Sequence, residues 1–220
     1  MKVDIYVEGI SDKLAMQALL APLLEEKSQQ GISIDFFAVK GNNNDRGGDA
    51  KKDLLIKIPI KAVDIIRNKP ATLVVIMPDL YPKNKGFAHE TVRELESGIF
   101  NNFNQALYSK GIDDNRLREC LKVFCFKHDL ESLILAAESQ LRSVLGINAL
   151  PMTWIQPVED QNHNVPPKDI VERMFQRCGK KYKGSVDAPR ILGNANYHDI
   201  ADECPQAFRP FVDFLENLYL

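Results

Sequence analysis

Hydrophobic residues along this chain fall into short β-rich runs that alternate with stretches of helical spacing. Four such runs predict strands, at residues 3–7, 32–39, 71–77 and 121–126. Apolar residues three and four positions apart predict helices at residues 11–26, 51–68, 89–108 and 130–145. Strands that alternate with helices indicate an α/β fold, in which a central parallel, Rossmann-like sheet is flanked by helices.

The pattern changes after about residue 149. Four prolines, Pro151, Pro157, Pro166 and Pro167, punctuate a loop-rich stretch. Two helical segments follow, near residues 168–178 and 197–218. We therefore predict an α/β domain over residues 1–148. Residues 149–220 are expected to form a loop-rich helical extension packed on that domain.

Composition narrows the class of protein. The chain has 220 residues, of which 45% are hydrophobic, so a buried core is expected and wholesale disorder is not. A net charge of -2 neither indicates nor excludes nucleic-acid binding. No apolar stretch is long enough for a membrane span, and the N-terminus lacks a signal-peptide pattern. With four cysteines outside any CxxC spacing, we expect reduced thiols and a cytoplasmic protein.

Carboxylates follow the predicted strands where each strand ends. Glu8 comes directly after the first strand and Asp79 after the third, which are expected to be neighbours in the centre of the sheet. Asp129 and Glu131 follow the fourth strand at the same edge. Neighbouring strands are about 4.8 Å apart, so these acids could share a hard divalent cation. The pattern therefore predicts a magnesium site, with manganese as an alternative.

Each acid also has a purely structural interpretation. Glu8 could order the turn at Gly9, and Asp79 could be an ordinary turn residue. Asp12 is better explained as a favourable charge in the first turn of a helix than as a ligand. His128 is a candidate proton-transfer group, although we favour a solvent-facing residue at a helix start. The functional interpretation is favoured because Glu8 and Asp79 occupy matching positions at the ends of two strands.

Several short segments resemble the TOPRIM fold of topoisomerases, primases and OLD-type nucleases. The run Val7-Glu8-Gly9-Ile10-Ser11-Asp12 is similar to that fold's opening motif, and Asp79 in Ile76-Met77-Pro78-Asp79-Leu80-Tyr81 is similar to its second acid. His128-Asp129-Leu130-Glu131 resembles the acidic segment of the stand-alone bacterial branch. The segment from Pro167-Lys168 to Cys204-Pro205 is similar to a C-terminal segment of the same branch.

The resemblance implies a TOPRIM-like nuclease that hydrolyses phosphodiester bonds in DNA or RNA with magnesium. Glu8 would be a metal ligand or general acid/base, Asp79 a metal ligand, and Glu131 a third catalytic residue. Stand-alone members are similar to proteins that accompany ABC-type or AAA ATPases in bacterial anti-phage systems, which implies an ATPase partner. The usual DxD pattern is broken by Tyr81, so Asp129 and Glu131 compensate, one metal suffices, or catalysis is lost.

Basic residues that flank these acids, and others in a later basic run, are candidate contacts to nucleic-acid phosphates. The set comprises Lys83, Lys85, Lys127, Lys180, Lys181 and Lys183. Such contacts would be salt-dependent and independent of sequence. The alternative is an ordinary solvated surface.

Two further functions stay open alongside the nuclease. The chain could be a non-catalytic TOPRIM-fold subunit that binds and regulates an ATPase, an interpretation that Tyr81 and the modest net charge favour. It could also be a flavodoxin-like binder of a small molecule, which predicts a deep apolar pocket at the sheet edge. The sequence leaves open the choice of DNA or RNA and the state of oligomerisation.

Overall fold

A parallel sheet of four strands lies at the centre of the computed structural model, which describes residues 1–39, 50–161 and 164–219. In chain order, the strands are β1 (Lys2–Val7), β2 (Ser33–Ala38), β3 (Thr72–Met77) and β4 (Leu121–Val123). Their spatial order is β2-β1-β3-β4, and Val7 pairs with Ala38 on one side and Met77 on the other. The predicted α/β class and the central position of the first and third strands are confirmed.

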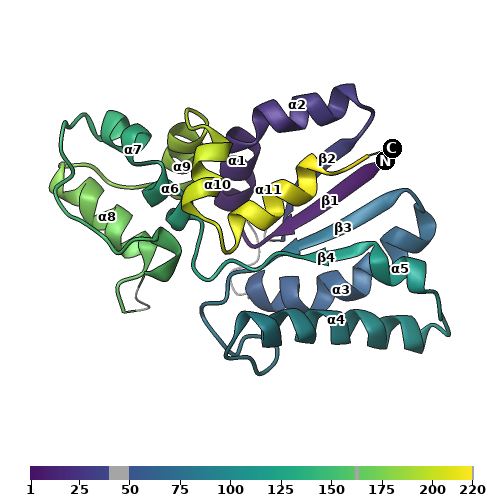
Figure 1. Ribbon diagram of the computed structural model, residues 1–220. Helices are drawn as coiled ribbons and strands as arrows, with labels where there is room; N and C mark the ends of the chain where they lie inside the picture. The colour runs from purple at the N-terminus through teal and green to yellow at the C-terminus, as the bar shows by residue number, and fades with distance from the viewer. Residues whose placement is uncertain (40–49, 162–163, 220) are drawn as a thin grey trace.

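Helices cover both faces of this sheet (Figure 1). On one face lie α3 (Ala50–Asn68), α4 (Val92–Ser109) and the short α5 (Asn115–Glu119). Their apolar side chains form one core with the side chains that β1, β3 and β4 direct toward them, such as Tyr6 and Val74. The helix over residues 50–68 is continuous although Pro59 lies inside it.

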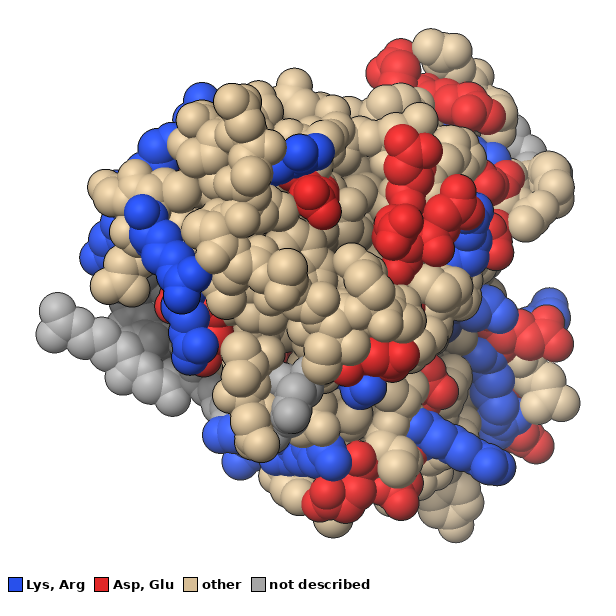
Figure 2. Space-filling model, turned by 60° about the vertical axis from the view of Figure 1, so that its left-hand side comes forward, with Lys and Arg blue, Asp and Glu red and all other residues tan. Residues whose placement is uncertain are grey.

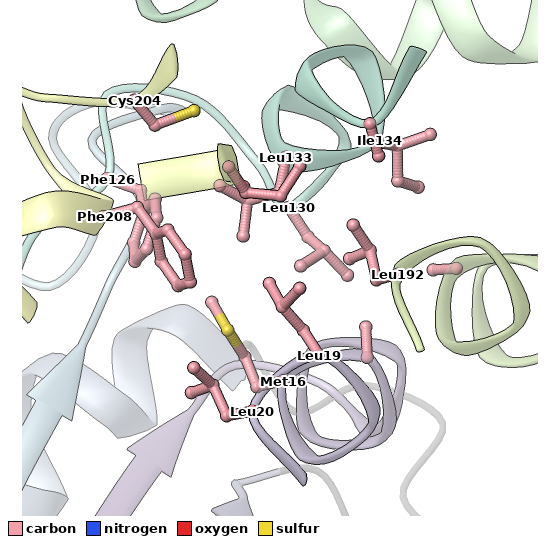
Figure 3. Close-up of a cluster of buried hydrophobic side chains, with 14 of the residues drawn as sticks. Met16, Leu19, Leu20, Phe126, Leu130, Leu133, Ile134, Leu192, Cys204 and Phe208 are labelled. Carbon is pink, nitrogen blue, oxygen red and sulfur yellow. The ribbon is translucent and has the colours of Figure 1, made fainter. Parts of the chain in front are cut away.

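The other face is covered by α1 (Ile10–Leu19) and α2 (Ala21–Gln29), with α11 (Phe208–Glu216) beside them (Figure 1). Further helices of the second half of the chain pack on α1 and on one another, beyond the carboxyl ends of the strands. These are α6 (Glu131–Ala136), α7 (Glu138–Leu145), α8 (Pro167–Arg177), α9 (Gly184–Leu192) and α10 (Tyr197–Glu203), with a 3-10 turn at Val158–Asp160. Figure 3 shows side chains of α1, Met16 and Leu19 among them, meeting Leu133 and Leu192. The division of the chain at residue 148 stays a prediction, but this core is continuous across it.

The helical predictions differ from the structure in several places, and the segment at 197–218 is two helices, α10 and α11. The segment at 11–26 is two helices separated at Leu20, because Pro22 cannot donate to the preceding turn and begins a new helix. The segment at 130–145 is likewise divided at Ala137. The helix α9, which contains Pro189, was not predicted at all.

All four cysteines are free thiols. Among the residues that the structure describes, none of the helices combines the length and the apolar character needed to cross a lipid bilayer.

Candidate functional site

Glu8 and Asp79 meet at the carboxyl edge of the sheet, immediately beyond β1 and β3. The backbone amide of Asp79 donates a hydrogen bond of 3.5 Å to Oε1 of Glu8. The chain around Asp79 is fixed by Phe126, whose carbonyl accepts a 2.7 Å hydrogen bond from the amide of Leu80. The structure therefore brings together the two acids on which the sequence interpretation depends.

A small cavity separates these two acids from the first turn of α1. It has a volume of about 20 Å³ and is lined by Val7, Glu8, Asp12, Met16, Met77, Asp79, Phe126 and Leu130. A space of this size accepts one water-sized particle. Its wall is apolar except for three carboxylates.

Asp12 belongs to this cavity, which sequence reasoning missed. Its Oδ2 accepts a 2.8 Å hydrogen bond from the amide of Gly9, as a first-turn acid does, yet the same side chain lines the cavity. The short spacing between the end of the first strand and Asp12 could have indicated this, because a residue in the first turn of a helix that directly follows a strand lies near the strand end.

Burial and mutual repulsion raise the pKa values of these acids. The pKa of Asp79 lies well above its ordinary value because the group is buried and faces the negative charges of Glu8, Asp12 and Asp129, while Lys51 opposes the shift. Burial also raises the pKa of Asp12. Without a cation, the cluster therefore holds protons that solvent-exposed carboxylates would have released.

Asp129 and Glu131 extend the cluster at the start of α6. Burial, followed by the charge of Glu131, raises the pKa of Asp129 to about 7, against the positive charge of Lys168. Oδ1 of Asp129 is buried and has no hydrogen-bond partner among the described residues. Glu131 is buried as well, and its Oε1 accepts a 2.9 Å hydrogen bond from the hydroxyl of Tyr182.

Three contributors to this site, Lys51, Lys168 and Tyr182, gave no recognisable signal in the sequence. Lys51 lies near the beginning of α3, Lys168 in the first turn of α8, and Tyr182 just before α9. Each is far in sequence from the acids it influences. Only the packing of the helices around the sheet edge brings them there.

The expectation for His128 is wrong. Its side chain is buried rather than solvent-facing, and its Nε2 lies 2.8 Å from the carbonyl oxygen of Gln161. The ring of Tyr81 stacks on the imidazole with 5.3 Å between ring centroids. Because the imidazole is buried and held by these two contacts, His128 is part of the framework that supports the acidic segment.

The six lysines proposed as phosphate contacts are in different environments. Lys83 forms an ion pair with Glu90, and Lys127 lies 3.5 Å from Asp160. Lys180 donates hydrogen bonds of 2.8 Å to the carbonyls of Val144 and Leu145 at the end of α7, which gives it a structural role. The remaining three, Lys85, Lys181 and Lys183, are exposed. On the face drawn in Figure 2, basic and acidic side chains are interspersed, and no continuous basic surface dominates.

The side chains of the acidic cluster are of the right chemical type to bind a hard cation, but their positions do not form a coordination site. Among the described residues, no three His, Cys, Asp or Glu side chains are arranged to hold a metal ion. The donors are nevertheless carboxylate oxygens, which Mg²⁺ prefers. Raised pKa values and the orphaned Oδ1 of Asp129 indicate a deficit of positive charge. A cation would therefore have to draw these side chains together.

A family model described as a domain of unknown function (DUF4276) matches residues 7–216. Among solved structures, the C-terminal region of the Burkholderia pseudomallei OLD protein is 18% identical, with a TM-score of 0.47 over 98% of this chain and 96% of that one. The C-terminal region of the Xanthomonas campestris pv. campestris OLD protein is 14% identical, with a TM-score of 0.47 over 98% and 95%. Similarity at these values of sequence identity and TM-score does not indicate a function for this chain. No curated protein matches the chain.

Proposed function

We propose a function from the site itself, since the chain belongs to the family described as a domain of unknown function (DUF4276). The function is that of a TOPRIM-like nuclease, which hydrolyses phosphodiester bonds of DNA or RNA with Mg²⁺ or Mn²⁺. One observation carries the proposal: Glu8, Asp12 and Asp79 line a single cavity at the carboxyl edge of a parallel sheet. In open α/β sheets this edge is where ligands bind.

Glu8, Asp12 and Asp79 would hold the cation, with Asp129 and Glu131 beside them. A bound Mg²⁺ supplies polarisation of a phosphoryl oxygen and orients an attacking water. The raised pKa values of Asp79, Asp12 and Asp129 mean that cation binding displaces protons from this cluster. Cation affinity should therefore increase as the pH rises.

The chain's own residues provide the rest of the site. Lys51 places a positive charge near Asp79, and Lys168 does the same for Asp129. Lys85, Lys181 and Lys183 are exposed, so they would contact phosphates by charge at the surface. The short TOPRIM-like motifs around Glu8 and Asp79 support the choice of phosphodiester chemistry.

The resemblance of these motifs to stand-alone bacterial TOPRIM proteins extends the proposal to a biological setting. In that setting the chain is the nuclease effector of an anti-phage system, and an ABC-type or AAA ATPase restrains or delivers it. Co-purification of the chain with an ATPase from its own cell tests this extension separately from the chemistry.

The test of the chemistry is a cleavage assay with single-stranded DNA, duplex DNA and RNA, in Mg²⁺ or Mn²⁺, with and without an ATPase partner. We expect cleavage by the wild type, and cleavage at background level for Glu8→Gln and Asp79→Asn. Glu172→Gln, on the exposed side of α8, is the matched control and should cleave normally. Cleavage by Glu8→Gln at the wild-type rate contradicts the catalytic assignment.

A second candidate is a non-catalytic subunit that binds and regulates an ATPase. Two observations favour it: Tyr81 stands where the TOPRIM pattern has a second acid, and the described residues contain no ready-made metal-ligand group. Calorimetry separates the two functions. No binding of Mg²⁺ at millimolar concentration, together with tight binding to an ATPase, supports the regulatory subunit.

A further inference from the structure

Tyr182 makes a specific contact with the acidic cluster from the second half of the chain. Its hydroxyl donates a 2.9 Å hydrogen bond to Oε1 of Glu131, and the two residues are 51 positions apart. Glu131 begins α6 and is buried, with 6% of its surface exposed. A buried carboxylate depends on such donors because little water reaches it.

The phenol ring is itself fixed by packing. It lies edge-on against Phe175 of α8, with 5.1 Å between ring centroids. Gly184 lets the start of α9 approach α1 closely, since a Cβ atom there would lie 3.1 Å from Oγ of Ser11 and 3.8 Å from the hydroxyl of Tyr182. Burial and the charge of Glu131 raise the pKa of Tyr182, so the hydroxyl stays a neutral donor.

The neighbours of Tyr182 in sequence face the opposite way. Lys181 and Lys183 are exposed, whereas Tyr182 between them is half-buried. Alternation of this kind is what an extended backbone produces. One short segment therefore presents two positive charges to solvent and one hydroxyl to the acidic cluster.

We propose that Tyr182 is a positioning residue, which fixes the carboxylate of Glu131 within the acidic site. The consequence for metal binding and catalysis rests on the proposed function, whereas the positioning of Glu131 does not. The C-terminal helical part of the chain thus completes the site and does more than cover the sheet. Groups of this kind that orient a metal ligand change metal affinity or activity about 10- to 100-fold when removed.

The variant Tyr182→Phe tests this proposal, because it removes the hydroxyl and keeps the ring that packs on Phe175. The matched control is Tyr197→Phe, which removes a similar hydrogen bond of 3.2 Å to Glu216 at a distance from the site. Crystal structures of both variants and of the wild type, without metal, show whether Glu131 stays in place. Electron paramagnetic resonance then measures the affinity of each protein for Mn²⁺.

We expect the Glu131 carboxylate to be displaced or disordered in Tyr182→Phe alone. We also expect the Mn²⁺ affinity of that variant to fall about tenfold. For cleavage, kcat should fall with KM for nucleic acid unchanged, whereas neutralising Lys181 and Lys183 should raise KM. Both tyrosine variants should retain the thermal midpoint of the wild type within a few degrees.

The outcomes separate this proposal from the proposed function. If Glu131 moves in Tyr182→Phe but the wild type binds no Mn²⁺ and cleaves nothing, the positioning role stands and the nuclease proposal falls. If the wild type cleaves nucleic acid and Glu131 keeps its place in Tyr182→Phe, with Mn²⁺ affinity unchanged, the positioning role is overturned.

Discussion

The carboxylates of the acidic cluster lie close together, and their proximity lowers the free energy of unfolding. Asp79 is partly buried and feels the negative charges of three other carboxylates, and Asp129 has an oxygen without a hydrogen-bond partner among the described residues. Interiors normally pair such groups. An arrangement that raises several pKa values in one place is typical of sites selected for binding or chemistry.

The pKa of Asp129 predicts how stability depends on pH. It is raised from 3.8 to about 7, so between these values the folded chain keeps a proton that the unfolded chain has lost. The resulting stabilisation is fully present below about pH 4 and is lost as the pH rises through 7. Asp129→Asn should therefore be more stable than the wild type at pH 8, by at most about 4 kcal/mol, and equal to it near pH 4.

Thermal unfolding between pH 4 and 8.5, with a chelator present, measures this difference. Asp213→Asn, on the exposed side of α11, is the control and should follow the wild type at every pH. Part of the pH dependence should survive in Asp129→Asn, because the pKa values of Asp79 and Glu131 are raised too. Equal stability of Asp129→Asn and the wild type at pH 8 would contradict the raised pKa.

At the scale of elements, a buried lysine connects α3 to the loop that follows β3. The Nζ of Lys51 donates hydrogen bonds of 2.9 Å to the carbonyl of Leu80 and 2.8 Å to that of Pro82. The far end of the loop is anchored by Phe87, which packs so closely on α4 that a Cβ atom at Gly98 would lie 2.0 Å from its ring. The loop that carries Asp79 is thus held at both ends.

Replacing this lysine should impair both folding and function. Lys51→Met should lower the free energy of unfolding by about 2 kcal/mol and reduce cleavage, because the backbone beside Asp79 loses its anchor. Lys27→Met is a matched control: Lys27 is equally buried and donates to the carbonyls of Glu216 and Leu218, far in sequence from the acids. It should destabilise the fold to a similar extent and leave cleavage unchanged at temperatures where the chain is folded. Equal losses of cleavage in both would mean that Lys51 acts through stability alone.

The strands and the position of the acids were predictable because both follow from local rules. A buried parallel strand needs an apolar run, and an acid after that run must lie at the carboxyl edge, so Glu8 and Asp79 could be placed together from sequence. The helix α9 was not predictable in this way. Pro189 disrupts its pattern, and it is stabilised by packing on α1 that no local signal records.

The contributions of Lys51, Lys168 and Tyr182 to the site were beyond local reasoning for a related reason. Each side chain reaches the acids only through the packing of its own element against others, and lysine or tyrosine near a helix start is common at ordinary surfaces. The same limit explains His128, whose burial depends on the stacked ring of Tyr81 and on Gln161. Residue spacing in the sequence predicts where a strand ends. It does not predict which residues pack around that end in the folded chain.

For the whole molecule, one face of the sheet is covered by residues from both halves of the chain. The core on this face joins Met16 and Leu19 of α1 with Ile191 of α9 and Phe208 of α11. The second half therefore contributes to the stability of the first, in addition to providing Lys168 and Tyr182.

A fragment of residues 1–148 should consequently fail to fold cooperatively, although the predicted boundary falls there. Removing the later helices exposes Met16, Leu19, Leu133 and other core side chains, at about 2 kcal/mol each. A handful of such losses equals the whole stability of a typical domain, about 5–15 kcal/mol. Thermal unfolding and amide NMR dispersion measure the result, and a chain ending at Leu218 is the control, because Tyr219 is 73% exposed. A sharp, cooperative transition of the fragment would show instead that the α/β part is an independent folding unit and that the C-terminal helices are needed only for the site.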